Sequence, residues 1–265
     1  MIYEGVTTKM QTEWNQPIAY YMVWDHSFLS MNEVIGQRLQ LERVGYQCLQ
    51  CGKPKKIFRQ GFCYDCSMSS AHAGDWILRP ELSTAHLGIE DRDLSYEQKV
   101  QLQPHTVYLA VSSEVKVGVT RNSQIPTRWI DQGASAAIAV VEVPNRYLAG
   151  IAEVALKSNY VDKTHWQKMV KNEIIHVDLL AEREQALLHL PEECMPFVAQ
   201  QAPDPIELNY PTLRYPTKVQ SVNLEKTPSF ADVLIGIKGQ YLLFESGAVC
   251  NVRSHEGFVL RWTIG

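Results

Sequence analysis

Two Cys-x-x-Cys pairs constrain this chain more than any other feature. Cys48 and Cys51 form the first pair, Cys63 and Cys66 form the second, and eleven residues separate them. Paired thiolates at this spacing hold a tetrahedral zinc ion, and the spacer suits the short hairpin of a zinc ribbon. An iron–sulfur cluster also takes four thiolates, and a redox dithiol is the third interpretation. We expect structural zinc, which stabilises a loop and leaves no coordination position open.

The segment around these cysteines is basic. Between positions 43 and 62 there are five basic residues and no acidic ones, and four of the five lie in the spacer, namely Lys53, Lys55, Lys56 and Arg59. One interpretation is that they offset the negative charge of a zinc–thiolate centre on a solvated face. The other is that they contact the phosphates of a nucleic acid, DNA or RNA. The sequence leaves both open.

Composition excludes several classes of protein. The chain has 265 residues, is 45% hydrophobic and carries a formal net charge of −4, so it can bury a core and does not bind nucleic acid through bulk charge. Its longest apolar stretch, 134–141, is far shorter than the ~20 residues of a membrane helix. The first four residues show no basic or apolar region typical of a signal peptide. We therefore expect a cytoplasmic protein without a membrane partner.

Hydrophobic patterning predicts the α+β class. Apolar or alternating runs at 18–24, 34–44, 233–237, 241–244 and 258–264 are typical of strands. We expect residues 1–104, with the ribbon at 48–66, to form a β-rich region with the C-terminal segment 221–265. Residues 67–104 look irregular, and the proline-rich stretch 191–220 is expected to be a linker.

Residues 105–190 predict an inserted domain of order β-β-α-β-α-α. The expected elements are strands at 106–111 and 115–120, a helix at 126–132, a strand at 136–143, a helix at 146–158 and a long helix that begins at a capping box on Thr164.

Four residues of this region resemble the motif residues of the GIY-YIG nuclease superfamily. They are Tyr108, Lys116 of Lys116-Val117-Gly118, Arg128 and Glu153. Lys116 replaces the second tyrosine of that superfamily. The resemblance implies metal-dependent hydrolysis of a phosphodiester in a cleft on an exposed sheet face. Each residue also has an ordinary structural explanation, such as a half-buried aromatic or a surface lysine.

The chemistry of phosphodiester hydrolysis suggests a role for each of these residues. Tyr108 would orient or deprotonate water, and a nearby Lys116 would favour its phenolate. Glu153 would hold Mg²⁺ or Mn²⁺, and Arg128 would grip the phosphate. Arg146, seven residues before Glu153, would brace that carboxylate or contact the strand backbone.

Nearly the whole chain also resembles domain-of-unknown-function family 2797. The matching segments are Cys48-Leu49-Gln50-Cys51-Gly52, Gly61-Phe62-Cys63-Tyr64-Asp65-Cys66, Tyr108-Leu109-Ala110, Lys116-Val117-Gly118-Val119-Thr120-Arg121, Arg128-Trp129-Ile130-Asp131-Gln132-Gly133-Ala134 and Gly236-Ile237-Lys238-Gly239-Gln240-Tyr241-Leu242. This resemblance implies a cytosolic protein but no activity.

Three functions are consistent with these features. The first is a metal-dependent phosphodiesterase or nuclease that acts on DNA or RNA. The second is a non-catalytic nucleic-acid-binding protein whose nuclease-like core only grips phosphates through Arg128 and the basic spacer. The third is an enzyme that modifies RNA in the same pocket.

Overall fold

The computed structural model describes residues 1–161 and 165–265, and it confirms the α+β class. The chain forms two compact units. The first contains Met1–Met68, Val170–Asn172 and Leu208–Gly265, and the second contains Ser69–Met169 and Glu173–Glu207. The predicted capping box on Thr164 lies outside the described residues. Among the helices of the described ranges, none is both long and apolar enough to cross a membrane.

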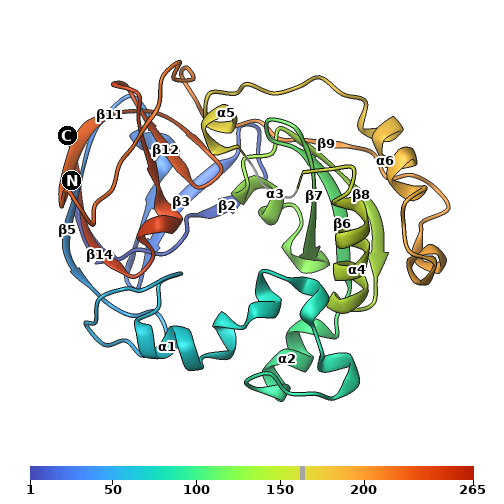
Figure 1. Ribbon diagram of the computed structural model, residues 1–265. Helices are drawn as coiled ribbons and strands as arrows, with labels where there is room; N and C mark the ends of the chain where they lie inside the picture. Colours follow the sequence, from blue (N-terminus) through green and yellow to red (C-terminus); the bar gives the residue numbers. More distant parts are fainter. Residues whose placement is uncertain (162–164) are drawn as a thin grey trace. The chain divides into compact units, whose positions relative to one another are not determined.

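The first unit contains a seven-stranded sheet to which both ends of the chain contribute. Its strands, in spatial order, are β1 (Ile2–Val6), β14 (Phe258–Ile264), β5 (Arg38–Tyr46), β11 (Ser229–Lys238), β12 (Tyr241–Phe244), β13 (Ala248–Asn251) and β10 (Gln220–Ser221). β1 and β14 are antiparallel, with Ile2 opposite Thr263. In Figure 1 the blue and red ends of the chain therefore lie in one sheet.

Alternation of apolar and polar side chains explains these strands. In β14, Phe258, Leu260, Trp262 and Ile264 are buried, and the residues between them are partly exposed. β5 places Leu41 opposite Trp262, and neither side chain is more than 1% exposed. Successive strand residues point to opposite faces, so this pattern buries one face of the sheet and leaves the other wetter.

A smaller sheet and several short helices complete the first unit. The sheet contains β2 (Gln11–Glu13), β3 (Ala19–Trp24) and β4 (Ser27–Ser30), all antiparallel. The 3₁₀ helices η1 (Met31–Val34) and η8 (Val252–His255) belong to this unit, and α1 (Tyr64–Ser69) begins directly after Cys63 and contains Cys66.

The second unit contains a four-stranded antiparallel sheet. Its order is β7 (Val115–Arg121), β6 (His105–Val111), β8 (Ala136–Val143) and β9 (Ile206–Glu207). Its helices are α2 (Leu94–Gln101), α3 (Thr127–Asp131), α4 (Arg146–Leu156), α5 (Trp166–Val170) and α6 (Leu179–Leu187), with α5 ending at the border between the units. The 3₁₀ turns are η2 (Ala71–Ala73), η3 (Asp75–Ile77), η4 (Pro80–Leu82), η5 (Ala85–Leu87), η6 (Asn122–Gln124) and η7 (Glu192–Phe197).

Both faces of this sheet are buried, but only one of them belongs to the apolar core that packs against α4. One face contributes Val107, Leu109 and Val117 to a core that also contains Ala152 and Leu156 of α4. Such a contact buries the apolar stripe of an amphipathic helix. The other face carries the residues that alternate with these, among them Tyr108, and its side chains are also buried.

The long helix expected from Thr164 onward is wrong. α5 ends at Val170, and Asn172 adopts a φ of 58°, a left-handed conformation that ends a helix. A second helix, α6, begins at Leu179 because the Asp178 side chain accepts the N–H groups of Leu180 and Ala181.

Two further expectations need correction. Residues 69–104 lie in the second unit rather than in the N-terminal β region, and they include the regular helix α2, capped by Asp93. The proline-rich stretch is not only a linker, since it contains η7 and also β9, which pairs with β8. The sequence pattern did not reveal α2 because a charged residue, Glu97, is buried in its first turn. The Glu97 carboxylate accepts the N–H groups of residues 91 to 93, directly before the helix.

Candidate functional site

The first unit gathers the four paired cysteines into one cluster. One ligand atom from each of Cys48, Cys51, Cys63 and Cys66 lies within 4.8 Å of every other. Cys48 and Cys63 are buried, whereas Cys51 is exposed and Cys66 is intermediate. Four soft thiols at this separation fit a tetrahedral metal such as zinc and leave no position for a substrate.

A tight hairpin brings the two cysteine pairs together. Gln60 and Gly61 both have positive φ, 53° and 77°, and Phe62 donates its N–H to the carbonyl of Arg59 at 2.9 Å. Two consecutive positive φ values are typical of a type I′ turn. Leu49 donates its N–H to the carbonyl of Gly61, so the first knuckle is joined directly to this turn.

The pKa values of two of the thiols are shifted in opposite directions. Burial opposes ionisation of Cys48, but the N–H groups of Cys51, Cys63 and Gln50 outweigh it and lower its pKa to about 6. Burial and hydrogen bonds from the other three cysteines raise the pKa of Cys66 to about 12. The cluster therefore accepts one thiolate readily and resists the last one, and a bound dication would relieve this conflict.

Most of the basic spacer residues already have partners within the first unit. Lys55 Nζ lies 2.6 Å from Asp65, Lys56 Nζ lies 2.9 Å from Glu225, and Arg59 Nε donates to the Ser67 hydroxyl at 2.8 Å. Both lysine pairs are exposed, so each adds little to stability. Lys55 and Lys56 therefore have their charges balanced by carboxylates of the same unit. Phosphate contact by the basic spacer stays a prediction.

The second unit brings the four nuclease-like residues into one electrostatic neighbourhood. Tyr108 lies on β6 and Lys116 on β7, and the pairing of Tyr108 with Gly118 places both on one sheet face. Arg128 lies on α3 and Glu153 on α4. The charges of Arg128 and Glu153 act on both Tyr108 and Lys116.

Tyr108 differs from the expectation in two ways. Its side chain is fully buried, so it does not line an exposed sheet face, and burial raises its pKa rather than lowering it. Arg128 and Gln132 favour the phenolate, although neither meets hydrogen-bond geometry with the hydroxyl among the described residues. The phenol lies across Gly118, where a Cβ atom would be 2.6 Å from the hydroxyl oxygen. Burial therefore keeps Tyr108 as a neutral phenol, which disfavours its predicted role in deprotonating water.

Burial brings the pKa of Lys116 close to neutrality. The residue is 5% exposed, and burial together with the charge of Arg128 lowers its pKa to about 7, against the opposing effect of Glu153. Removing an ammonium from water disfavours its charged form. A lysine in this state can accept or release a proton at neutral pH.

The negative charge of Glu153 is partly neutralised by nearby basic side chains. The residue is 9% exposed, and its Oε2 lies 3.5 Å from Lys157 Nζ, one turn further along α4. Burial raises its pKa, Lys157 and Arg146 lower it, and Glu81 raises it again. A carboxylate whose proton affinity is raised gains from a second cation.

Arg146 does not brace Glu153 through an ion pair among the described residues. Its guanidinium donates to the carbonyls of Trp76 and Ile77 at 3.1 and 2.8 Å and lies 5.4 Å from the Trp76 ring centre. It therefore fastens the η3 turn to α4 and acts on Glu153 only through its charge.

Sequence reasoning missed Glu81. Its turn, η4, approaches α4 so closely that a Cβ atom on Gly150 would lie 2.3 Å from the Glu81 nitrogen. This contact brings a second carboxylate into the field of Glu153. The one signal in the sequence was a glycine in the middle of an otherwise regular helix, which usually marks a close approach.

These features define an α+β protein with a four-cysteine cluster that could hold a metal in one unit and a buried charged cluster in the other. Residues 36–260 match the family described as "Protein of unknown function (DUF2797)", and the chain belongs to that family. No curated protein and no solved structure matches the chain significantly.

Proposed function

We propose that this protein is a metal-dependent phosphodiesterase that cleaves DNA or RNA at the cluster of Tyr108, Lys116, Arg128 and Glu153. One observation carries the proposal. Residues from four separate elements share a single electrostatic neighbourhood in which a lysine titrates near neutral pH. Perturbed groups of this kind cluster at functional sites more often than elsewhere.

The arrangement of elements also supports the proposal. The hairpin of β6 and β7 precedes α3, β8 and α4, the order implied by the resemblance to GIY-YIG nucleases. Arg128 and Glu153 lie on the two helices that this resemblance requires. Lys116 occupies the position of that superfamily's second tyrosine, so the proposed chemistry uses an amine there.

Each residue has a role in the proposed hydrolysis. Neutral Lys116 accepts a proton from water as the water oxygen bonds to phosphorus, and the ester P–O bond breaks with its electron pair on the leaving oxygen. That oxygen then takes a proton from solvent. Arg128 stabilises the charge on the phosphate oxygens. The buried ring of Tyr108 packs edge to face against Trp129, the residue after Arg128 on α3, with ring centroids 5.8 Å apart. A Mg²⁺ or Mn²⁺ ion held by Glu153 would polarise the phosphate.

A second candidate function is a binder without catalysis. The full burial of Tyr108 and the pairing of Glu153 with Lys157 favour it, because both reduce access to reacting groups. In that case Arg128 would grip phosphates and no bond would break.

The test compares two neutralised carboxylates. We expect Glu153→Gln to lower Mg²⁺- or Mn²⁺-dependent cleavage of single- or double-stranded DNA or RNA by more than about a hundredfold. The matched control is Glu142→Gln, because Glu142 is an exposed glutamate on β8 of the same unit. If the wild-type protein cleaves none of these substrates but binds one of them through Arg128, the non-catalytic binder becomes the supported function and the phosphodiesterase is rejected.

A further inference from the structure

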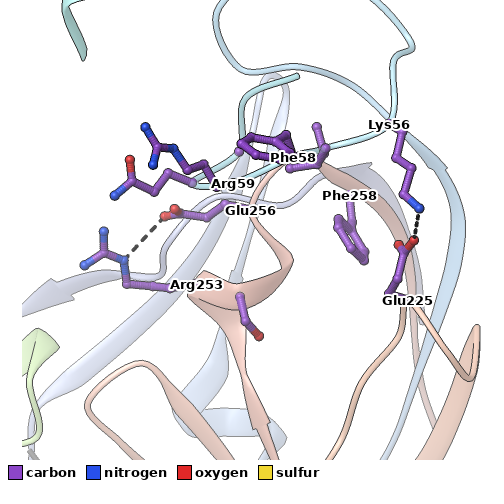
Figure 2. A pocket seen from close by; sticks show the side chains of 11 residues that line it. Lys56, Phe58, Arg59, Glu225, Arg253, Glu256 and Phe258 are labelled. Atoms are coloured by element: carbon purple, nitrogen blue, oxygen red, sulfur yellow. Dashed lines mark ion pairs between the residues drawn. The ribbon is translucent and has the colours of Figure 1, made fainter. Parts of the chain in front are cut away.

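The first unit contains a pocket of about 340 Å³ beside the cysteine cluster, shown in Figure 2. The hairpin that joins the two cysteine pairs forms one side, and segments near the C-terminus form the other. The lining residues are Lys56, Ile57, Phe58, Arg59, Gln60, Gly61, Glu225, Arg253, Ser254, Glu256 and Phe258.

An aromatic side chain stands exposed at this pocket. Phe58 is 54% exposed, and its one ring contact among the described residues is Tyr64, edge to face at 5.2 Å and itself 60% exposed. The backbone around Phe58 is fixed, since its N–H donates to the carbonyl of Phe62 at 2.7 Å. A large apolar ring exposed to water offers a flat surface on which a planar group can stack.

Two guanidinium groups lie on one side of the same pocket. Figure 2 shows Arg59 and Arg253 there, with the Glu256 carboxylate between them. Arg59 uses Nε to bond Ser67, and Arg253 Nε lies 3.7 Å from Glu256. In the described part of the chain, the terminal nitrogens of both arginines make no side-chain hydrogen bond, so they are available to a phosphate.

The opposite side of the pocket is closed by a charge pair. Lys56 binds Glu225, which also accepts a hydrogen bond from the Tyr46 hydroxyl at 2.5 Å. The pocket therefore presents an aromatic ring between a neutral pair and an end with two arginines and one carboxylate, which carries a net positive charge (Figure 2). This polarity suits a ligand with a flat apolar part at one end and an anion at the other.

We propose that this pocket binds one unpaired nucleotide of a single-stranded nucleic acid. The base stacks on Phe58, and its phosphate contacts Arg59 and Arg253. A base in a duplex is stacked on both faces, so an isolated ring favours single strands. An acidic peptide would satisfy the arginines but would leave Phe58 in water. The inference rests on the proposed function only for the class of partner, because binding here needs no group of the Tyr108 cluster.

The first experiment tests stacking. Fluorescence anisotropy would measure binding of twelve-nucleotide oligo-dT and oligo-U, and of a duplex of equal length, in buffer without Mg²⁺. We expect both single strands to bind more tightly than the duplex, and Phe58→Ala to weaken single-strand binding about tenfold. The matched control is Phe28→Ala, because Phe28 is 64% exposed in the same unit but does not line the pocket.

The second experiment tests the phosphate contact. The double variant Arg59→Gln/Arg253→Gln should reduce the salt slope of single-strand binding by about 0.7, because the two arginines contact one phosphate and each phosphate neutralised on a single strand adds roughly 0.7 to that slope. Arg214→Gln, an exposed arginine outside the pocket, is the control. Zinc content and circular dichroism of each variant would establish that the ribbon stays folded.

The outcomes separate this inference from the proposed function. No single-strand binding at low salt, or binding that neither Phe58→Ala nor the double arginine variant changes, would overturn the nucleotide pocket. Binding that depends on Phe58 without cleavage would uphold the pocket and reject the phosphodiesterase. Cleavage of nucleic acid, with binding unchanged in both variants, would uphold the phosphodiesterase and reject the nucleotide pocket.

Discussion

The four-cysteine cluster and the buried cluster around Tyr108 bring ionisable groups together in opposite ways. The four cysteines come from nineteen consecutive residues and could hold a cation that balances the charge of their thiolates. Tyr108, Lys116, Arg128 and Glu153 come from four elements. Burial shifts the pKa values of Tyr108, Lys116 and Glu153 toward their neutral forms. The first site should therefore respond to metal removal, whereas the second should respond to pH and to packing.

Metal removal should have the largest effect. Cys63→Ser should release about one zinc ion per chain, because a serine oxygen is a poor substitute for a thiolate. Structural zinc contributes roughly 10–16 kcal/mol in zinc-finger peptides, so we expect the hairpin to lose more than about 4 kcal/mol of protection. Elemental analysis and hydrogen exchange at the Phe62 amide would measure both changes.

The control for this prediction is Cys194→Ser. Cys194 is a lone buried cysteine of the second unit, so zinc content should not change. The comparison would break if the purified protein held iron or no metal. It would also break if Cys63→Ser removed amide protection at Tyr108 as much as at Phe62, since the two sites would then form one cooperative structure.

Replacing the buried Lys116 with a neutral residue should have the next largest effect on stability, and it should stabilise the protein rather than destabilise it. Burial lowers the pKa of Lys116 from 10.5 to about 7, so charging it destabilises the folded second unit. Lys116→Met keeps the length of the side chain and removes the charge. We expect it to raise the free energy of unfolding at pH 7 by about 2–4 kcal/mol while abolishing cleavage.

The pH dependence supplies an independent check on Lys116. The pKa is lower in the folded chain, so the unfolded chain binds more protons between pH of about 7 and 10.5. Lys116 therefore makes stability rise with pH across this window. Lys116→Met should flatten that rise, as measured by hydrogen exchange of β6 amides. A rise of equal slope in the variant would assign the effect to another group.

A packing change should have the smallest of the three effects. Gly118→Ala would place a Cβ atom 2.6 Å from the Tyr108 hydroxyl, and the fully buried ring has little room to move. We expect a loss of about 1–3 kcal/mol in unfolding free energy, with zinc content unchanged. Thermal unfolding would measure it, and Gly45→Ala, where the nearest atom would be 3.8 Å away, is the control. Equal losses in both variants would show that the cluster is not tightly packed.

The elements with local causes could be predicted from the amino-acid sequence. Alternation of apolar and polar residues predicted β8, β12 and β14 at the bounds observed. The spacing of Cys48, Cys51, Cys63 and Cys66 predicted their cluster, because short knuckles and one tight turn bring the sulfurs together without help from distant residues. The α+β class followed from the same patterns.

Only the tertiary structure decided the burial of Tyr108, the pKa of Lys116 and the approach of Glu81 to Glu153. A strand pattern states which residues share a face, but it does not state what covers that face. The break between α5 and α6 was hidden for a similar reason, since the apolar spacing continues through a left-handed Asn172. Burial, and therefore proton affinity, depends on segments far apart in the chain, and one-dimensional patterns do not record their contacts.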